Sequence, residues 1–328
     1  MKVTIKEIAA ICGFSIGTVD RAMHDRKGIN PKSRERVLAV AQQLGYRPHL
    51  LARSLVTGFT MSIGAVVPNL KNPFFSELVE VIQKKARTAG YHVYMMLSEF
   101  DPKEEIASLD RLRALNVDGI AIMPVNRGRA FQAYLKSLAT PIVTIANRVS
   151  KQWTWVGIDD RAAVRDAGRY VISKGYARII FVTQQQDPRS LQSLYCDDQR
   201  ILGYKEALRE AEGSPAPFVV TDETMIRMIE ETELAGWERT CILASCDAVA
   251  LEVMSVLKAH HIAIPQTVGL MGMDNLEELK YITPRLTTVA SPIQKIGERA
   301  FDYLLETIKG GCVEPGVLEH RIVEGETV

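Results

Sequence analysis

The stretch GFSIGTVDRAMHDR, residues 13–26, has the spacing of a short helix with one apolar face and one mixed face. Val19 and Met23 lie four residues apart, so both can face a core. The opposite face then carries small, apolar and charged side chains, namely Ile16, Gly17, Asp20, Arg21 and His24. A glycine inside a helix lowers its stability by about 1 kcal/mol. We therefore expect this face to meet a partner that needs close approach.

The residues around this stretch predict two more helices. The motif TIKE, residues 4–7, is a capping box, and the helix that it opens is followed by a tight glycine turn. Ser15 can cap the second helix. Asn30 opens a third helix, which Gly45 closes. Three short helices with a tight turn between the first two predict a helix-turn-helix domain over residues 1–46.

A hydrolase motif overlaps the same turn. The segment Gly13–Gly17 matches the G-x-S-x-G pattern of a nucleophile elbow. That elbow follows a buried strand, whereas a capped amphipathic helix precedes this segment. We therefore interpret Ser15 as a helix cap and not as a nucleophile.

The charge distribution favours nucleic acid as the partner of the first domain. Residues 1–60 hold ten Lys and Arg against four Asp and Glu, whereas the whole chain has a formal net charge of +1. A basic head on a mildly acidic body suggests a polyanion that binds the head alone. No apolar run is long enough to span a bilayer, and the N-terminus lacks a signal-peptide core. With five scattered cysteines, we expect a cytoplasmic protein with reduced thiols and no membrane partner.

In a helix-turn-helix domain, the second helix reads base edges in the major groove. Arg21 can donate two hydrogen bonds to a guanine, and Ile16 can contact a thymine methyl group. His24 can reach a base or a phosphate. Asp20 has three interpretations: it accepts from a cytosine amino group, it orients Arg21, or it pairs with His24 on a solvated face.

Two segments resemble the lactose-repressor (LacI/GalR) family of bacterial transcription regulators. They are VTIKEIAAICGFSIGTVDRAM, residues 3–23, and YRPHLLARSLVTG, residues 46–58, and the similarity extends to about residue 323. The family usually has Ser where this chain has Asp20, which puts the outer bases of the operator in question. The residue patterns and the resemblance together predict a DNA-binding set: Thr4, Ser15, Ile16, Gly17, Thr18, Asp20, Arg21, His24, Arg26, Tyr46, Ala52, Arg53 and Leu55.

The resemblance also implies a function for the linker, residues 47–60. In the family, the segment matching Pro48–Leu55 folds into a hinge helix only on operator DNA. The leucine matching Leu55 enters a base step from the minor groove, with Ala52 and Arg53 as its neighbours there. A helix of about eight residues is too short to be stable alone, so a partner has to order it. The alternative is a plain linker whose leucines pack on the core.

From residue 61 onward, strand-like apolar runs alternate with helical patterns such as Pro73–Ala89, Asp160–Lys174, Arg200–Glu212 and Asp247–His261. This alternation indicates doubly wound parallel sheets of the α/β class. The expected fold is an all-α helix-turn-helix domain followed by a two-lobed body, residues 61–328, like that of periplasmic binding proteins. The first lobe is expected over about 61–159 and 291–320, and the second over about 160–290 and 321–328.

Ligands of doubly wound sheets bind beyond the carboxyl ends of the strands, which in two lobes is the cleft between them. Carboxylates, amides, an arginine and aromatic faces at those ends suit a polyhydroxylated ligand. The resemblance implies that most of these positions line the effector cleft. The predicted effector-binding set is Asn69, Phe74, Phe75, Asn147, Arg148, Asp159, Arg200 and Asp274. Asp160 could instead cap the helix that follows it, and Cys246 stands where the family commonly has Asn.

These patterns predict a transcriptional regulator, and not an enzyme, that represses from a palindromic operator. It is expected to act as a homodimer and to respond to a small effector: a sugar, a polyol or, because of Arg148 and Arg200, a sugar phosphate. No nucleotide, cofactor or metal motif is present in the sequence. Two alternatives remain, namely a sugar-binding receptor without a DNA role and a regulator controlled by a protein coregulator.

Overall fold

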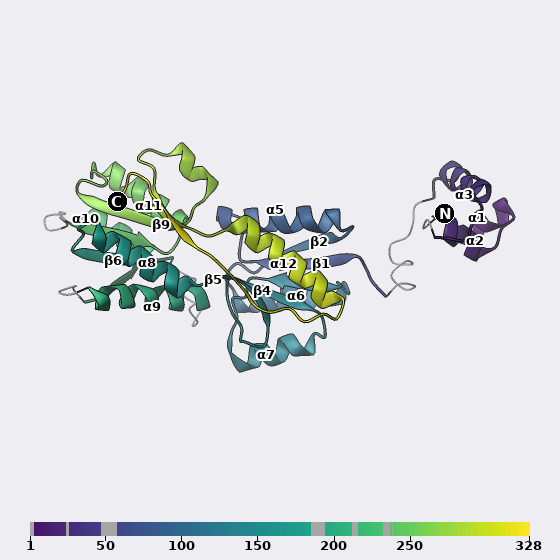
Figure 1. Cartoon of the computed structure of the whole chain (residues 1–328), viewed down its shortest axis with the longest axis horizontal. Helices are drawn as coiled ribbons and strands as arrows, with labels where there is room; N and C mark the ends of the chain where they lie inside the picture. The colour runs from purple at the N-terminus through teal and green to yellow at the C-terminus, as the bar shows by residue number, and fades with distance from the viewer. Residues whose placement is uncertain are drawn as a thin grey trace. The chain divides into compact units, whose positions relative to one another are not determined.

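The computed structural model describes residues 3–23, 26–46, 58–184, 194–211, 216–231, 237 and 239–328. The chain divides into two units, Met1–Thr60 and Met61–Val328, and the second unit contains both sheets (Figure 1). Among the described residues, no helix is both long and apolar enough to cross a membrane.

The first unit is a three-helix head. Its helices are α1 (Ile5–Cys12), α2 (Ile16–Met23) and α3 (Pro31–Gln43). The expected caps are present, because Thr4 and Glu7 form a capping box on α1 and Asn30 caps α3. Gly13 ends α1 at a φ of 67°, a conformation that a Cβ disfavours, and this allows the tight turn into α2. The buried core of the head is Ile8, Ala9, Cys12, Val19, Ala22, Val37 and Ala41.

The first sheet of the body is parallel, with the order β11-β5-β4-β3-β1-β2. Its strands are β1 (Ser62–Val67), β2 (His92–Leu97), β3 (Gly119–Ile122), β4 (Ile142–Ile145), β5 (Thr154–Ile158) and β11 (Gly316–Leu318). Helices α5 (Pro73–Thr88) and α12 (Ile293–Ile308) cover one face, and α6 (Pro102–Ala114) and α7 (Gly128–Ser137) cover the other. Alternate residues of β1 show this layering, since Ile63 packs in the α5 cluster and Val66 in the α6 cluster.

The second sheet repeats this plan with the order β12-β10-β9-β8-β6-β7. Its strands are β6 (Arg178–Thr183), β7 (Phe218–Thr221), β8 (Thr240–Ala244), β9 (Val268–Asp274), β10 (Thr287–Ala290) and β12 (Arg321–Val323). Only β12 runs antiparallel to its neighbour among the described pairs. Helices α8 (Asp160–Ser173) and α9 (Tyr195–Glu210) pack on one face, and α10 (Asp222–Glu231) and α11 (Asp247–Ala259) pack on the other.

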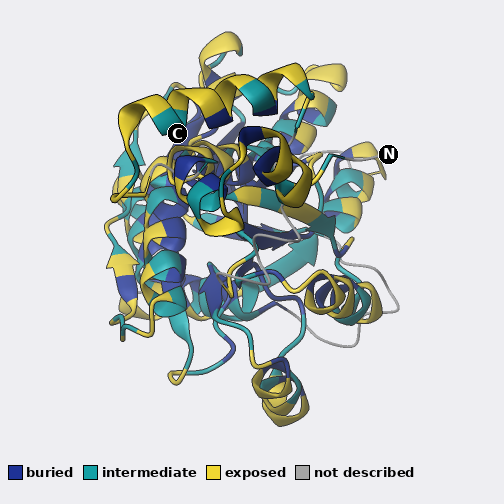
Figure 2. Ribbon diagram, turned by 90° about the vertical axis from the view of Figure 1, so that its right-hand side faces the viewer, coloured by how far each residue is buried: buried dark blue, intermediate teal, exposed yellow. Residues whose placement is uncertain are grey.

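The chain passes between the two lobes after β5, after β10 and between β11 and β12. Buried residues follow the sheets and the inner faces of the helices, whereas the outer faces are exposed (Figure 2). The predicted fold class is therefore confirmed.

The structure differs from the expected one in two details. Helix α9 begins at Tyr195, ahead of the predicted Arg200, because the acidic residues of its first turn suit the positive end of the helix dipole. Met23 is only partly buried. All five cysteines are free thiols; four are buried and Cys312 is exposed.

Candidate functional site

The predicted DNA-contacting face of α2 is exposed in the head. Val19 is fully buried in the core, whereas Ile16 on the opposite side is 50% exposed. Gly17 and Arg21 are exposed beside it. An exposed isoleucine next to a glycine and an arginine offers an apolar contact, close backbone approach and a bidentate donor on one surface.

Asp20 has a partner that none of the three interpretations included. Its carboxylate lies 3.3 Å from the guanidinium of Arg26, which follows the end of α2. The backbone N–H of Arg26 donates to the carbonyl of Arg21, so the chain turns back toward the helix at this point. Within the described part of the chain, Arg21 itself has no ion pair.

Serine and threonine side chains cap the N-termini of helices in the head. Ser15 Oγ accepts from the N–H of Thr18 at 3.2 Å and forms a 2.9 Å hydrogen bond with its hydroxyl, which confirms Ser15 as a cap. Thr4 Oγ1 likewise accepts from the N–H of Glu7.

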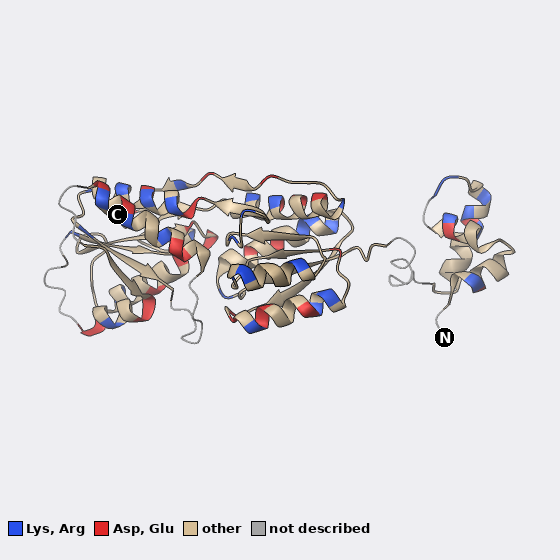
Figure 3. Ribbon diagram, turned by 90° about the horizontal axis from the view of Figure 1, so that it is seen from below, with Lys and Arg blue, Asp and Glu red and all other residues tan. Residues whose placement is uncertain are grey.

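Among the other predicted DNA-binding residues, Tyr46 packs against the core of the head. Burial, reinforced by the charge of Asp20, raises the pKa of Tyr46. Basic positions occur on the helices of the head (Figure 3). His24, Ala52, Arg53 and Leu55 lie outside the described residues.

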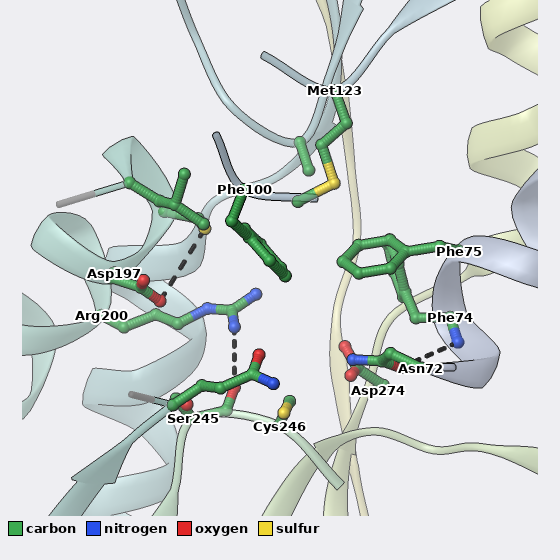
Figure 4. Close-up of a pocket in the computed structure, with 14 residues that line it drawn as sticks. Asn72, Phe74, Phe75, Phe100, Met123, Asp197, Arg200, Ser245, Cys246 and Asp274 are labelled. Carbon is green, nitrogen blue, oxygen red and sulfur yellow. Dashed lines mark hydrogen bonds between the residues drawn. The ribbon is translucent and has the colours of Figure 1, made fainter. Parts of the chain in front are cut away.

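A pocket lies at the carboxyl ends of both sheets (Figure 4). Residues that follow β1, β2, β3 and β4 of the first lobe and β6 and β8 of the second contribute to it, as does Asp274 at the end of β9. This is the position expected for a doubly wound fold. The lining residues are Asn72, Phe74, Phe75, Phe100, Met123, Ala146, Gln184, Leu194, Cys196, Asp197, Arg200, Ser245, Cys246 and Asp274.

The first lobe supplies an aromatic wall. Asn72 caps α5 by accepting from the N–H of Phe74 at 3.0 Å, and this places Phe74 and Phe75 in the first turn of the helix. Their ring centroids lie 5.6 Å apart at 89°, and Phe75 lies 6.1 Å from Phe100 at 63°. These edge-to-face contacts keep the rings in fixed orientations beside the cavity.

The second lobe supplies a polar floor around Arg200. Its Nε donates to Asp160 Oδ1 at 2.8 Å, and its Nη1 donates to the carbonyl of Ser245 at 2.7 Å. Burial raises the pKa of Asp160, and the charge of Arg200 opposes that shift. Two bonds from one planar group fix the guanidinium, and its second terminal nitrogen points toward the pocket (Figure 4).

Asp274, at the end of β9, is 4% exposed and has a φ of 123°, which is rare for a residue with a side chain. Asp247 holds the loop that follows Asp274. Its carboxylate accepts from the N–H of Leu276 in that loop at 3.0 Å and from the hydroxyl of Thr288 at 2.6 Å. Gly272 makes room for this, since a Cβ there would lie 2.2 Å from Asp247 Oδ1. Burial raises the pKa of Asp247 to about 6, and burial with neighbouring carboxylates raises that of Asp274.

Asn147 does not line the pocket, although the sequence analysis expects it there. Its Nδ2 donates to the carbonyl of Pro124 at 2.9 Å, and its Oδ1 accepts from the N–H of Cys196 at 2.9 Å. The first bond joins two residues of the first lobe, and the second joins the first lobe to α9 of the second lobe. Asn147 is therefore a buried link between the lobes, and its amide is occupied by backbone groups.

Three more predicted effector residues lie away from the pocket lining. Asn69 accepts from the N–H groups of Lys71 and Asn72 in a turn. The guanidinium of Arg148 lies 4.1 Å from the ring centroid of Trp155. Asp159 is exposed and caps α8, which reverses the expected roles of Asp159 and Asp160, because Asp160 is the one buried against Arg200.

Several lining residues were absent from the sequence prediction. Ser245 and Cys246 directly follow the apolar run TCILA, so their position at a strand end is a signal that the sequence contains. Met123 directly follows β3 and carries the same signal, whereas Phe100 lies three residues beyond β2, in a loop that has no apolar pattern of its own. Within the described ranges, no group of three or more His, Cys, Asp or Glu residues could hold a metal ion.

A second contact joins the lobes beside the pocket. Arg127 of the first lobe and Asp198 of α9 form an ion pair at 2.5 Å. An apolar cluster lies in the same region, with Val125 and Phe100 from the first lobe against Leu194 and Cys196 from the second. The lobes of this structure are thus in contact around the pocket.

Comparison with known proteins agrees with both parts of the chain. Residues 4–49 match the family model for bacterial regulatory proteins of the lacI family, and residues 169–328 match the model for the periplasmic binding protein-like domain. The chain carries the DNA-binding domain of the lacI family. Together with the second domain and the full-length relatives, this identifies a DNA-binding transcriptional regulator.

Full-length relatives support this assignment. Catabolite control protein A of Priestia megaterium is 28% identical over 331 residues, covering 98% of each chain. The transcriptional repressor PurR of Vibrio atlanticus is 28% identical and covers 99% of this chain and 98% of its own. The solved lac repressor dimer, bound to operator and an anti-inducer, has the same fold, with a TM-score of 0.87 at 20% identity over 100% of this chain and 99% of that chain.

Proposed function

We propose that this LacI-family regulator binds a palindromic operator as a homodimer and changes its operator affinity when a small polyhydroxylated effector occupies the pocket. The observation that carries the proposal is the composition of the pocket, with an aromatic wall from one lobe and a polar floor from the other. A ligand between them contacts both lobes and therefore favours one lobe arrangement over another. Such a preference can couple the pocket to the DNA-binding head.

On the DNA side, Arg21 and Ile16 are proposed to contact base edges, and Gly17 to allow close approach. One head makes few contacts, so two heads on a palindrome gain affinity through effective concentration. The linker residues Ala52, Arg53 and Leu55 are proposed to form the hinge helix on DNA. The similar lac repressor dimer, which was solved bound to operator and an anti-inducer, supports this arrangement.

On the effector side, the proposed ligand is a sugar or polyol. The guanidinium of Arg200 and the carboxyl group of Asp274 can bind hydroxyl groups, and Phe74 or Phe75 can pack on the apolar face of a sugar ring. The thiols of Cys196 and Cys246 are poor nucleophiles, because burial raises the pKa of both, that of Cys246 to about 12. These protonated thiols favour a binding role for the pocket over an enzymatic one. A regulator that binds its own operator would act in the cytoplasm.

The proposed dimer uses the β2 edge of the first sheet. Strand β2 is the last strand of that sheet, and Tyr94 and Met95 on it are 42% and 43% exposed. Tyr281, which is 77% exposed, adds a large apolar surface in the second lobe. Exposed aromatic and methionine side chains on an edge strand are typical of a surface that another chain covers.

The test measures binding of the full chain to the DNA upstream of its own gene, by fluorescence anisotropy and footprinting. We expect protection of a palindrome and a large loss of affinity in Leu55→Gly. Leu115→Gly, which changes a leucine of the body that is 44% exposed, is the matched control and should bind normally. Equal affinity for palindromic and scrambled duplexes, or unchanged binding in Leu55→Gly, would contradict the proposal.

A further inference from the structure

The polar floor of the pocket holds more carboxyl groups than basic groups. Among the described lining residues, Arg200 is the one basic side chain, whereas Asp197 and Asp274 are both acidic. Two further carboxyl groups, of Asp160 and Asp247, are buried behind this surface. When these carboxyl groups are ionised, the cavity therefore favours a positive ligand over a negative one.

Arg200 already forms an ion pair and a hydrogen bond with other groups of the protein. Its ion pair with Asp160, at 2.8 Å, has side-chain exposures of 13% and 4%, so water screens it little. The same guanidinium donates to the carbonyl of Ser245. A second arginine predicted for the site, Arg148, stacks on Trp155 outside the pocket lining. The two arginines that suggested a sugar phosphate thus do not form a phosphate site.

Among the described lining residues, Asp274 is a carboxyl group that lacks a hydrogen-bond donor. It is 4% exposed and lines the cavity, and within the described part of the chain no hydrogen-bond donor reaches its carboxylate. Its neighbour Asp247, by contrast, accepts from Leu276 and Thr288. A buried carboxylate without a donor is unfavourable, and a ligand that brings a positive donor removes that cost.

The groups packed around Asp274 agree with this assignment. Asp160 and Asp247 raise its pKa and Arg200 lowers it, while burial is the largest cause of the rise. Cys246, whose thiol pKa is also raised, adds no charge. Burial therefore shifts Asp274 toward its protonated form, and a cation beside it would shift it back toward the ionised form.

We propose that the effector carries an amino group, as an amino sugar or an amino-substituted polyol does, and that its ammonium binds Asp274 beside the faces of Phe74 and Phe75. Aromatic rings next to a carboxylate are a favourable environment for an ammonium group. This inference rests on the proposed function, because it names the ligand class of the same pocket.

The test uses matched sugars that differ in charge. Glucose, glucosamine and glucose 6-phosphate, with the corresponding galactose and mannose sets, are titrated into the full chain by calorimetry and by thermal shift. We expect at least one amino sugar to bind about tenfold or more tightly than its neutral partner, as a charged hydrogen bond allows, and the phosphates not to bind. Titrations in two buffers of different ionisation enthalpy should show proton release on binding.

Two variants separate charge recognition from general damage. Asp274→Asn should reduce the preference for the amino sugar to about onefold, whereas Glu252→Gln, which removes an exposed carboxylate of α11, should keep it. Calorimetric unfolding of each variant checks that it is folded. A neutral or phosphorylated sugar as the best ligand, the absence of binding by every amino sugar, or an unchanged preference in Asp274→Asn would overturn the inference. Operator binding is measured separately, and its loss in the unmodified chain would instead count against the proposed function.

Discussion

Gly17 shows how one residue can serve binding at a cost to stability. It lies on the exposed face of α2, where an added Cβ would meet nothing closer than Ser15 Oγ at 4.0 Å. The folded head therefore has room for a larger side chain. The reason for a glycine has to lie outside the head, and the proposed DNA contact supplies one.

Gly17→Ala should raise the stability of the head by about 0.5–1 kcal/mol, because alanine loses less backbone entropy in a helix. Operator affinity should fall roughly tenfold, because the methyl group occupies space needed for close approach. Thermal unfolding and anisotropy measure the two effects independently. Non-operator DNA serves as the control duplex, and an unchanged operator preference would show that this face does not approach bases.

Asp247 predicts an unusual pH dependence of stability. Its pKa in the folded chain is raised to about 6, above the value of about 3.9 expected when unfolded. Between these two pKa values the folded state therefore binds more protons than the unfolded state. The contribution of Asp247 to the free energy of unfolding is present below about pH 4 and is lost as the pH rises to about 6. The loss amounts to roughly 3 kcal/mol, from about 1.4 kcal/mol for each pKa unit.

Denaturant unfolding between pH 4 and 6 measures this loss. Asp247→Asn should be less stable throughout, because it loses an acceptor for a buried N–H group, but its stability should change less across this range. If the variant and the unmodified chain show parallel pH profiles, Asp247 does not titrate as described.

At the scale of elements, the start of α9 connects the two lobes. The loop after β3 reaches it through Arg127, and the loop after β4 reaches it through Asn147. Glu105 of α6 fixes the first of these loops, because its carboxylate accepts from the N–H groups of Val125 and Asn126 at 2.6 and 2.8 Å. Two loops of one lobe thus bind the first turn of one helix in the other.

Asn147→Ala should weaken this connection. The carbonyl of Pro124 and the N–H of Cys196 would both lose a buried partner, at a cost of about 1–3 kcal/mol each. We expect a lower melting temperature and weaker effector binding, because the lobes hold the ligand between them. Gln152→Ala, which removes an exposed amide, is the control and should change neither quantity. Normal effector affinity in Asn147→Ala would mean that the link does not stabilise the lobe arrangement that binds ligand.

At the scale of the whole molecule, the proposed dimer makes a prediction about its surface. Met95→Asp and Tyr281→Asp should each raise the dimer dissociation constant, because a charge would be buried in an apolar contact. Analytical ultracentrifugation measures this, and operator affinity should fall with dimerisation. Val317→Asp alters a side chain that is 59% exposed on β11, at the opposite edge of the same sheet, and should leave the dimer intact. A dimer unaffected by both of the first two variants would place the interface elsewhere.

The head and the secondary structure could be predicted from the sequence because their determinants act over a few residues. The capping box at Thr4, the cap at Asn30 and the turn at Gly13 all involve neighbours in the chain. The alternation of apolar runs and helical patterns likewise predicted two doubly wound sheets, and with them the edge where the pocket lies. The residues that were predicted from their position at that edge and that do line the pocket are Phe74, Phe75, Arg200 and Asp274.

Which polar side chains enter the pocket was decided only by the tertiary structure. Asn147, Arg148 and Asp159 also follow strands, yet a backbone pair, a tryptophan ring and a helix end bind them elsewhere. Phe100 reaches the cavity from the loop after β2, where it packs beside Phe75. A side chain goes to its strongest available partner, and when that partner is distant in the sequence, local patterns cannot identify it.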